Sequence, residues 1–133
     1  MGLAAEGKGL LAGAAGISSR GPNYHTPEIV KPDVTTPGIK IHRSMDSLVS
    51  PSELNFDPSR TEFNISSQTS ISCPHESSIA ALLRQRLPDW SPAAIKSTIT
   101  TTANNIDNSG KPSQDLASMS TPFDIGAGHI NTN

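Results

Sequence analysis

A serine at the start of a predicted helix is the residue of this chain best placed to do chemistry. Ser70 lies in the segment Gln-Thr-Ser-Ile-Ser-Cys-Pro-His at residues 68–75, where a strand pattern gives way to a helix pattern. The first turn of a helix leaves backbone amides without intrahelical partners and carries the positive end of the helix dipole. Such a setting stabilises the oxyanion that forms when a hydroxyl attacks a carbonyl. Most helix-start serines are simple caps, so position alone leaves both interpretations open.

A serine hydroxyl is a useful nucleophile only when a base takes its proton and a third group orients that base. His75 is the nearest histidine in the sequence, but five helical residues turn about 140° around the axis, so we expect its ring to point away from Ser70. The remaining histidines and the carboxylates that could orient a base fall in loops, turns or the terminal segment: His25, His42, His129, Asp33 and Asp57. The sequence therefore offers a nucleophile without a recognisable base.

Metal binding and covalent modification have weak support. Cys73 and His75 supply two ligands where a metal site needs three or four, so we expect no metal and no cofactor. Cys73 is the single cysteine, so it forms no internal disulfide and is expected to be a small buried side chain. Asn64-Ile65-Ser66 matches the glycosylation sequon but falls in a predicted strand, which favours a chance match.

Two predicted helices form the frame around Ser70. Apolar residues recur at three- and four-residue steps from Ile79 to Leu87, which predicts one helix over about 70–87. Pro88 and Asp89 end it. Ser91-Pro92 then opens a second helix over about 91–102, because serine caps free amides and proline suits the first helical position.

Short strands and loops make up the rest of the chain. Strands are predicted near residues 14–19, 33–35 and 63–66, and a last strand over 123–130 that two glycines interrupt. Residues 44–60 are rich in Ser, Pro, Asp and Glu and are expected to form an exposed loop. Residues 1–13 match no clear element.

Length and composition narrow the range of functions. The 133 residues suffice for one small domain, and an apolar fraction of 34% predicts a fold of marginal stability. Ten Lys and Arg residues against 12 Asp and Glu give a formal net charge of −2 without a basic cluster, so nucleic-acid binding has no support. The longest apolar-leaning stretch, residues 9–17, is too short to cross a membrane, and no targeting signal is recognised at the N-terminus.

Several motifs, taken in order, resemble those of plant-type subtilisin-like serine proteases, the subtilase family. The segment at 69–75 is similar to the family's nucleophile motif G-T-S-M-[AS]-C-P-H-V-x-G. The other matching segments are Ser-Ser-Arg-Gly-Pro-Asn at 18–23, Thr-Pro-Glu-Ile at 26–29, Lys-Pro-Asp-Val-Thr at 31–35, Pro-Gly at 37–38, Thr-Glu-Phe-Asn-Ile at 61–65, Pro-Asp-Trp-Ser-Pro-Ala-Ala-Ile-Lys-Ser at 88–97 and Thr-Pro-Phe-Asp-Ile-Gly-Ala-Gly-His at 121–129. The resemblance covers about residues 14–133.

The resemblance implies a fold of the α/β class. Residues 14–133 would be the C-terminal portion of a subtilase catalytic domain, following a poorly defined segment over 1–13. The expected architecture is a partial subtilisin-like fold, a fragment of a mostly parallel sheet with the two helices at about 70–87 and 91–102. The family is typically secreted, extracellular or in the cell wall, although the sequence leaves the compartment of this chain open.

The resemblance also implies a serine endopeptidase that acts on peptide or protein substrates. The nucleophile position falls on Ser70, whose backbone amide would contribute to the oxyanion hole. In the family the aspartate, the histidine and the oxyanion asparagine come from D-T-G, H-G-T-H and A-G-N segments, and none of these occurs in the 133 residues. Loss of a triad member costs several orders of magnitude in rate, so we expect residues 1–133 alone to be inactive.

Three residues depart from the family pattern near the nucleophile. Gln68 and Ser78 stand where the motif has glycine, and Glu76 stands where it has valine. Glu76 falls on the apolar stripe of the predicted helix, where an unpartnered buried carboxylate is costly, whereas an exposed one costs little.

Three functional interpretations remain open from the sequence. The chain could derive from an active endopeptidase and be truncated, it could be a non-catalytic subtilase remnant or protein-binding fragment, or it could be an incomplete gene model of an active protease. The departures at Gln68 and Ser78 favour the second, and the well-preserved motifs elsewhere favour descent from an active enzyme.

Overall fold

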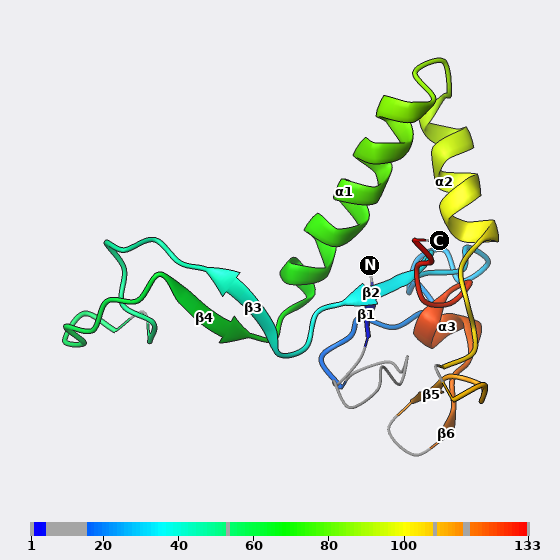
Figure 1. The fold of residues 1–133 in the computed structure, drawn as a ribbon. Helices are drawn as coiled ribbons and strands as arrows, with labels where there is room; N and C mark the ends of the chain where they lie inside the picture. Colours follow the sequence, from blue (N-terminus) through cyan, green and yellow to red (C-terminus); the bar gives the residue numbers. More distant parts are fainter. Residues whose placement is uncertain (1, 5–15, 53, 108, 116–117, 133) are drawn as a thin grey trace.

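Two helices form a hairpin above the rest of the chain (Figure 1). The computed structural model describes residues 2–4, 16–52, 54–107, 109–115 and 118–132. Helix α1 spans Thr69–Arg86 and helix α2 spans Pro92–Thr101. Ser91 Oγ accepts a hydrogen bond of 3.2 Å from the Ala94 amide, with Pro92 as the first helical residue. Both predicted helices are therefore confirmed to within a residue at each end.

The core lies where α1 and α2 meet the strand region. Its buried members are Val34, Ile95, Ile99 and Ile130, with Ile79, Leu83 and Trp90 packed against them. Ile79 and Leu83 belong to the apolar stripe that predicted α1, but Leu82 on the same stripe is 64% exposed. The buried apolar set is small, as the low apolar fraction predicts.

The strands form three two-stranded sheets. The strands are β1 (Gly2–Ala4), β2 (Thr35–Pro37), β3 (Ile41–Ser44), β4 (Phe63–Ser66), β5 (Gln114–Asp115) and β6 (Ser118–Met119). β1 pairs in parallel with β2, whereas the pairs β3–β4 and β5–β6 are antiparallel. The α/β class and the strand at 63–66 are confirmed. Of the mostly parallel sheet, the described residues hold one parallel pair and a parallel bridge between Thr35 and His129.

The predicted strand over 123–130 is wrong: its first half is helical, and its second half holds a turn and isolated bridges at His129. Residues Pro122–Ile125 form a short helix, α3. Thr121 and Asp124 make a capping box, in which the Thr121 amide donates to Asp124 Oδ2 at 2.8 Å, and Pro122 occupies the first helical position. Reciprocal capping and the fixed φ of proline favour a helix turn over an extended chain.

The predicted strand near 14–19 is also not formed over its described part. Residues 16–18 lie in a turn and bend, and residues 14 and 15 lie outside the described residues. Of the N-terminal segment 1–13, only residues 2–4 are described, as β1. The strand expected near 33–35 forms two residues later, as β2.

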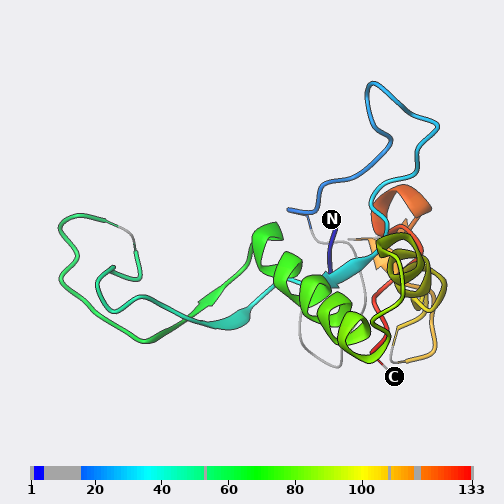
Figure 2. The ribbon, with the colours of Figure 1, turned by 90° about the horizontal axis from the view of Figure 1, so that it is seen from above.

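The hairpin of β3 and β4 extends away from the body of the molecule, as both views show (Figures 1 and 2). We call residues 41–66 the arm. Its tip contains the loop expected over 44–60, and its exposed large apolar side chains include Leu48, Phe56, Phe63 and Ile65. His42 stacks on Phe63 with the ring centroids 5.2 Å apart.

The C-terminal segment joins the strand region to the end of α2 through its backbone. His129 exchanges hydrogen bonds of 2.7 and 2.8 Å with Asn104, while Thr35 donates to Gly128 and accepts from Ile130, each at 2.9 Å. The imidazole of His129 is half-buried, and its Nε2 atom is buried without a hydrogen-bond partner among the described residues. Burial lowers the pKa of His129 below 6.5, and nearby His75 adds to the shift.

Gly126 is required by the close approach of two backbone segments. Its φ is +63°, and a Cβ atom there would overlap the carbonyl oxygens of Pro32 and Asp33. We expect Gly126→Ala to destabilise the fold by about 3 kcal/mol, through backbone strain and overpacking. Urea unfolding followed by far-ultraviolet circular dichroism measures the change.

Two other glycines provide matched controls for that measurement. Gly110→Ala meets no atom within 4 Å but keeps a φ of +78°, so it should cost about 1 kcal/mol of strain. Gly16→Ala has open space and no positive φ, so its unfolding midpoint should equal that of the unmodified chain. Equal midpoints for the Gly16 and Gly126 variants would contradict the close approach.

The half-buried imidazole of His129 predicts that stability falls on mild acidification. Its pKa is lowered in the folded state, so the unfolded state binds the proton more readily. The contribution of neutral His129 is complete above about pH 6.5 and is lost as the pH falls through the lowered value. Thermal unfolding between pH 7 and pH 5 should show a decreasing Tm, with a weaker slope in His129→Gln. The exposed His25→Gln control should keep the full slope, and equal slopes in all three proteins would refute the prediction.

Candidate active site

Ser70 lies in the first turn of α1 with its side chain exposed. Gln68, two residues before Ser70, is the N-cap of α1, with φ −155° and ψ 153°, an ordinary extended conformation. The side chain that replaces the motif's glycine therefore imposes no backbone strain. The Ser70 hydroxyl donates a hydrogen bond of 3.0 Å to Oε1 of Gln68.

Buried polar contacts hold the start of α1 against β2. Thr36 Oγ1 donates to the Ser72 carbonyl at 2.9 Å, and Ser72 Oγ donates to the Thr36 carbonyl at 3.3 Å. Thr36 is 3% exposed and Ser72 is 1% exposed. We call these two hydrogen bonds the Thr36–Ser72 clamp. The clamp fixes the backbone of the first turn of α1, which contains Ser70, against β2.

A second pair of contacts fixes the residues immediately before the helix. The Gln68 amide donates to the Gly38 carbonyl at 3.0 Å, and the Lys40 amide donates to Ser67 Oγ at 2.8 Å. The turn after β2 therefore holds the chain just before Ser70. Strand β2 and its following turn together determine where the hydroxyl sits.

None of the four histidines, all of which are described, is hydrogen-bonded to Ser70. His75 Nδ1 lies 3.0 Å from the carbonyl oxygen of Ile71 on its own helix, and His129 Nδ1 lies 2.9 Å from the Ile130 carbonyl oxygen. His25 is exposed beside Tyr24, with ring centroids 6.4 Å apart. His42 is in the arm, stacked on Phe63. Ser70 and a base are therefore not brought together within the described residues.

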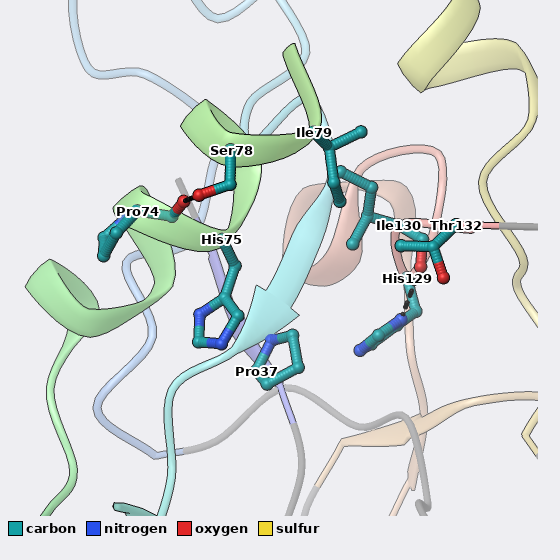
Figure 3. A pocket seen from close by; sticks show the side chains of 8 residues that line it. All are labelled: Pro37, Pro74, His75, Ser78, Ile79, His129, Ile130 and Thr132. Atoms are coloured by element: carbon teal, nitrogen blue, oxygen red, sulfur yellow. Dashed lines mark hydrogen bonds between the residues drawn. The ribbon is translucent and has the colours of Figure 1, made fainter. Parts of the chain in front are cut away.

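His75 and His129 project into one pocket beside β2, on either side of Pro37 (Figure 3). The pocket has a volume of about 470 Å³. Its wall is mostly apolar, with Pro74 and Ile79 among the lining residues, and Ser70 is not one of them. Ser78, which replaces a motif glycine, also lines the pocket and bonds its hydroxyl to the Pro74 carbonyl at 2.7 Å. On α1 the pocket is thus lined by residues within 74–79, and the candidate nucleophile is not part of its wall.

The two carboxylates considered as partners for a base have other roles. Partial burial opposes ionisation of Asp33, but hydrogen bonds and charge from Lys31 and Lys96 outweigh it and lower its pKa. Lys96 Nζ on α2 lies 2.8 Å from Asp33 Oδ1, so this carboxylate connects α2 to the segment before β2. Asp57 lies in the loop of the arm, where hydrogen bonds from Ser52 and Ser59 lower its pKa to about 2.

Glu76 lies on the apolar stripe of α1, and its charge acts on Lys96 of α2. Its side chain is half-buried. The pKa of Lys96 is raised, chiefly through Asp33, and the charge of Glu76 contributes to that shift. Glu76 is therefore only half-buried and is within electrostatic range of a cation on α2, so it is not a fully buried charge.

Other candidate sites lack the needed groups. The described residues hold no cluster of three or more His, Cys, Asp or Glu side chains that could bind a metal ion. Cys73 is a free, half-buried thiol with Sγ 3.9 Å from Ser77 Oγ. Asn64 is half-buried on β4, and its Nδ2 lies 3.5 Å from the Pro51 carbonyl oxygen. Across the described ranges, no helix has the length and apolarity needed to traverse a membrane.

The contacts of Thr36, Gly38 and Ser72 were not predicted as part of the site. They join residues about 30 or more positions apart, and a single sequence carries no signal for such pairings. Gln68 was noted only as a replacement for glycine. Its bond to the hydroxyl could have been suspected from its two-residue spacing to Ser70.

Comparison with known proteins agrees with the family that the motifs indicate. The model of the subtilase family matches residues 12–128. Subtilisin-like protease SBT1.4 of Arabidopsis thaliana is 54% identical over 121 residues, which are 90% of this chain and 16% of that protein. SBT1.3 of the same plant is 53% identical over 119 residues, or 88% of this chain and 15% of the relative. The subtilisin-like protease Glyma18g48580 of Glycine max is 49% identical over 119 residues, or 87% and 15%.

The chain therefore spans about one sixth of the length of the curated relatives it matches. A family model that matches most of the chain and relatives at this identity show that the chain belongs to the subtilase family of subtilisin-like serine proteases.

Proposed function

We propose that this chain carries the nucleophile-bearing part of a serine endopeptidase and that Ser70 is its nucleophile. The observation that carries the proposal is the placement of Ser70 in the first turn of α1, exposed and held by the Thr36–Ser72 clamp. Membership of the subtilase family supports it, because the matched relatives are named as proteases. The substrate class is peptides or proteins.

The reaction would proceed through an acyl-enzyme. Ser70 Oγ attacks the carbonyl carbon of the scissile peptide while its proton passes to an imidazole, and the carbonyl oxygen becomes an oxyanion. Backbone amides at the start of α1, that of Ser70 among them, favour this negative charge. The C–N bond then breaks as the imidazole gives the proton to the departing amine. Water hydrolyses the ester and returns the hydroxyl.

The base is the missing component in this arrangement. The four imidazoles of the chain contact other groups, at Ile71, Ile130, Phe63 and Tyr24. An amide oxygen such as that of Gln68 accepts a hydrogen bond but is far too weak a base to take a proton. We therefore propose that residues 1–133 alone do not hydrolyse peptide bonds.

A non-catalytic role in protein binding is the second candidate. It is favoured by the arm, where Leu48 is 79% exposed and Phe56 is 82% exposed. Exposed large apolar side chains are typical of surfaces that contact other proteins when they form a patch. The two candidates differ in whether Ser70 matters for function.

The first test of the proposal is chemical labelling of residues 1–133. We expect no reaction of Ser70 with a fluorophosphonate probe and no cleavage of peptide substrates, because no imidazole is hydrogen-bonded to the hydroxyl. Mass spectrometry of the intact chain measures the labelling, and Ser70→Ala gives the background. Stoichiometric labelling of Ser70 would show that a base is present after all.

The second test supplies the missing base from a relative. In a chimera, residues 16–133 replace the matching segment of SBT1.4, and we expect fluorophosphonate labelling and peptide cleavage that disappear with Ser70→Ala. Loss of the nucleophile should lower the rate by at least about a thousandfold. Ser77→Ala is the matched control, because among the described residues this exposed serine of α1 bonds only to the Cys73 carbonyl of its own helix and to the Cys73 thiol. A well-folded chimera that leaves Ser70 unlabelled would refute the nucleophile assignment.

A further inference from the structure

The side chain of Gln68 does not do what a residue at its position usually does. Gln68 is the N-cap of α1, and N-cap side chains commonly accept hydrogen bonds from amides of the first turn. Gln68 makes no such capping bond. Its carboxamide oxygen instead accepts from the hydroxyl of Ser70 at 3.0 Å.

This contact uses the one proton that the proposed reaction needs. A serine hydroxyl has a single O–H donor. While that donor points at Gln68 Oε1, it cannot point at an imidazole. Glycine, which the nucleophile motif has at this position, offers no side chain to compete.

We propose that Gln68 is a restraining residue for the nucleophile, which holds the Ser70 hydroxyl in an unreactive hydrogen bond and lowers its reactivity. This inference rests on the proposed role of Ser70. The side-chain oxygen of Gln68 accepts a hydrogen bond from the neutral hydroxyl of Ser70. The same oxygen offers no hydrogen bond to the ionised serine. Gln68 therefore acts through Ser70, as a positioning residue, and would set how readily any base can reach the proton.

The restraint can be measured without a catalytic base by placing a thiol at the same position. In the Ser70→Cys variant, made in a Cys73→Ser background, the thiolate sulfur attacks the carbon of iodoacetamide and displaces iodide. An acceptor facing the S–H group raises the thiol pKa, and removing it should lower that pKa and speed alkylation at pH 7. We expect Gln68→Ala to raise the second-order rate about threefold, the effect of one modest hydrogen bond.

The comparison uses two further variants in the same background. Gln68→Gly should behave like Gln68→Ala if the carboxamide is responsible, whereas a backbone effect of glycine would separate the two. Gln85→Ala removes the same kind of side chain from an exposed site further along α1 and should leave the rate unchanged. Helix content by circular dichroism checks that all variants fold alike.

Each result bears on the proposal directly. A rise in rate and a fall in thiol pKa for Gln68→Ala supports the restraint. An unchanged rate, or a decrease, overturns it, since a decrease would mean that the carboxamide donates to the anion and assists the nucleophile.

A second measurement uses the native hydroxyl. Ser70→Ala should shift the side-chain amide signals of Gln68 in the nuclear magnetic resonance spectrum and leave those of Gln85 unchanged, and an unshifted Gln68 would contradict the contact. Both measurements are independent of peptide hydrolysis. If the chimera shows that Ser70 is not the nucleophile, the contact between Gln68 and Ser70 can still be measured. If the Gln68 variants leave the alkylation rate and the amide signals unchanged, the assignment of Ser70 as the nucleophile still stands.

Discussion

The Thr36–Ser72 clamp is the contact on which the arrangement of this chain depends. Two hydroxyl groups and two carbonyl groups, all deeply buried, satisfy each other across the junction of β2 and α1. A buried polar group that loses its partner costs about 1–3 kcal/mol, so the two bonds favour one register of the helix against the strand. That register places Ser70 at the exposed side of the first helical turn.

The rest of the fold extends from this junction through few apolar contacts. Val34, just before β2, packs with Ile95, Ile99 and Ile130, and the backbone of His129 joins β2 to the end of α2. Charge supplements this small core, because Lys96 connects α2 to Asp33 through an ion pair. These charged groups are partly solvated, and ion pairs of that kind contribute little to stability. Packing around β2 is therefore what keeps the two helices in place.

The sequence predicts those parts of the structure that depend on neighbouring residues. Both helices follow from the period of the apolar residues and from Ser91-Pro92, and β4 follows from the alternation of apolar and polar residues over 63–66. Helix α3 was missed although Thr121, Pro122 and Asp124 carry a capping signal, because the apolar residues after them favoured a strand. The contacts of Thr36 with Ser72, and of Gly38 with Gln68, join distant segments, so no local pattern reveals them. The position of Ser70 at a helix start was thus predictable, whereas the means of holding it there was not.

Positioning and activation of the nucleophile are physically separate in this chain. The contacts that fix the helix start lie between residues 36 and 72, and none of them involves an imidazole. Their stability accordingly does not depend on whether a base is present. An imidazole would have to reach the hydroxyl from the solvent-exposed side, which is where the side chain of Gln68 lies. Gln68 in place of the motif's glycine leaves the extended backbone unstrained, and it changes the hydrogen bond made by the Ser70 hydroxyl proton. The position of Ser70 at the helix start is therefore independent of the base that would activate it, because the base takes no part in the contacts that hold the helix start.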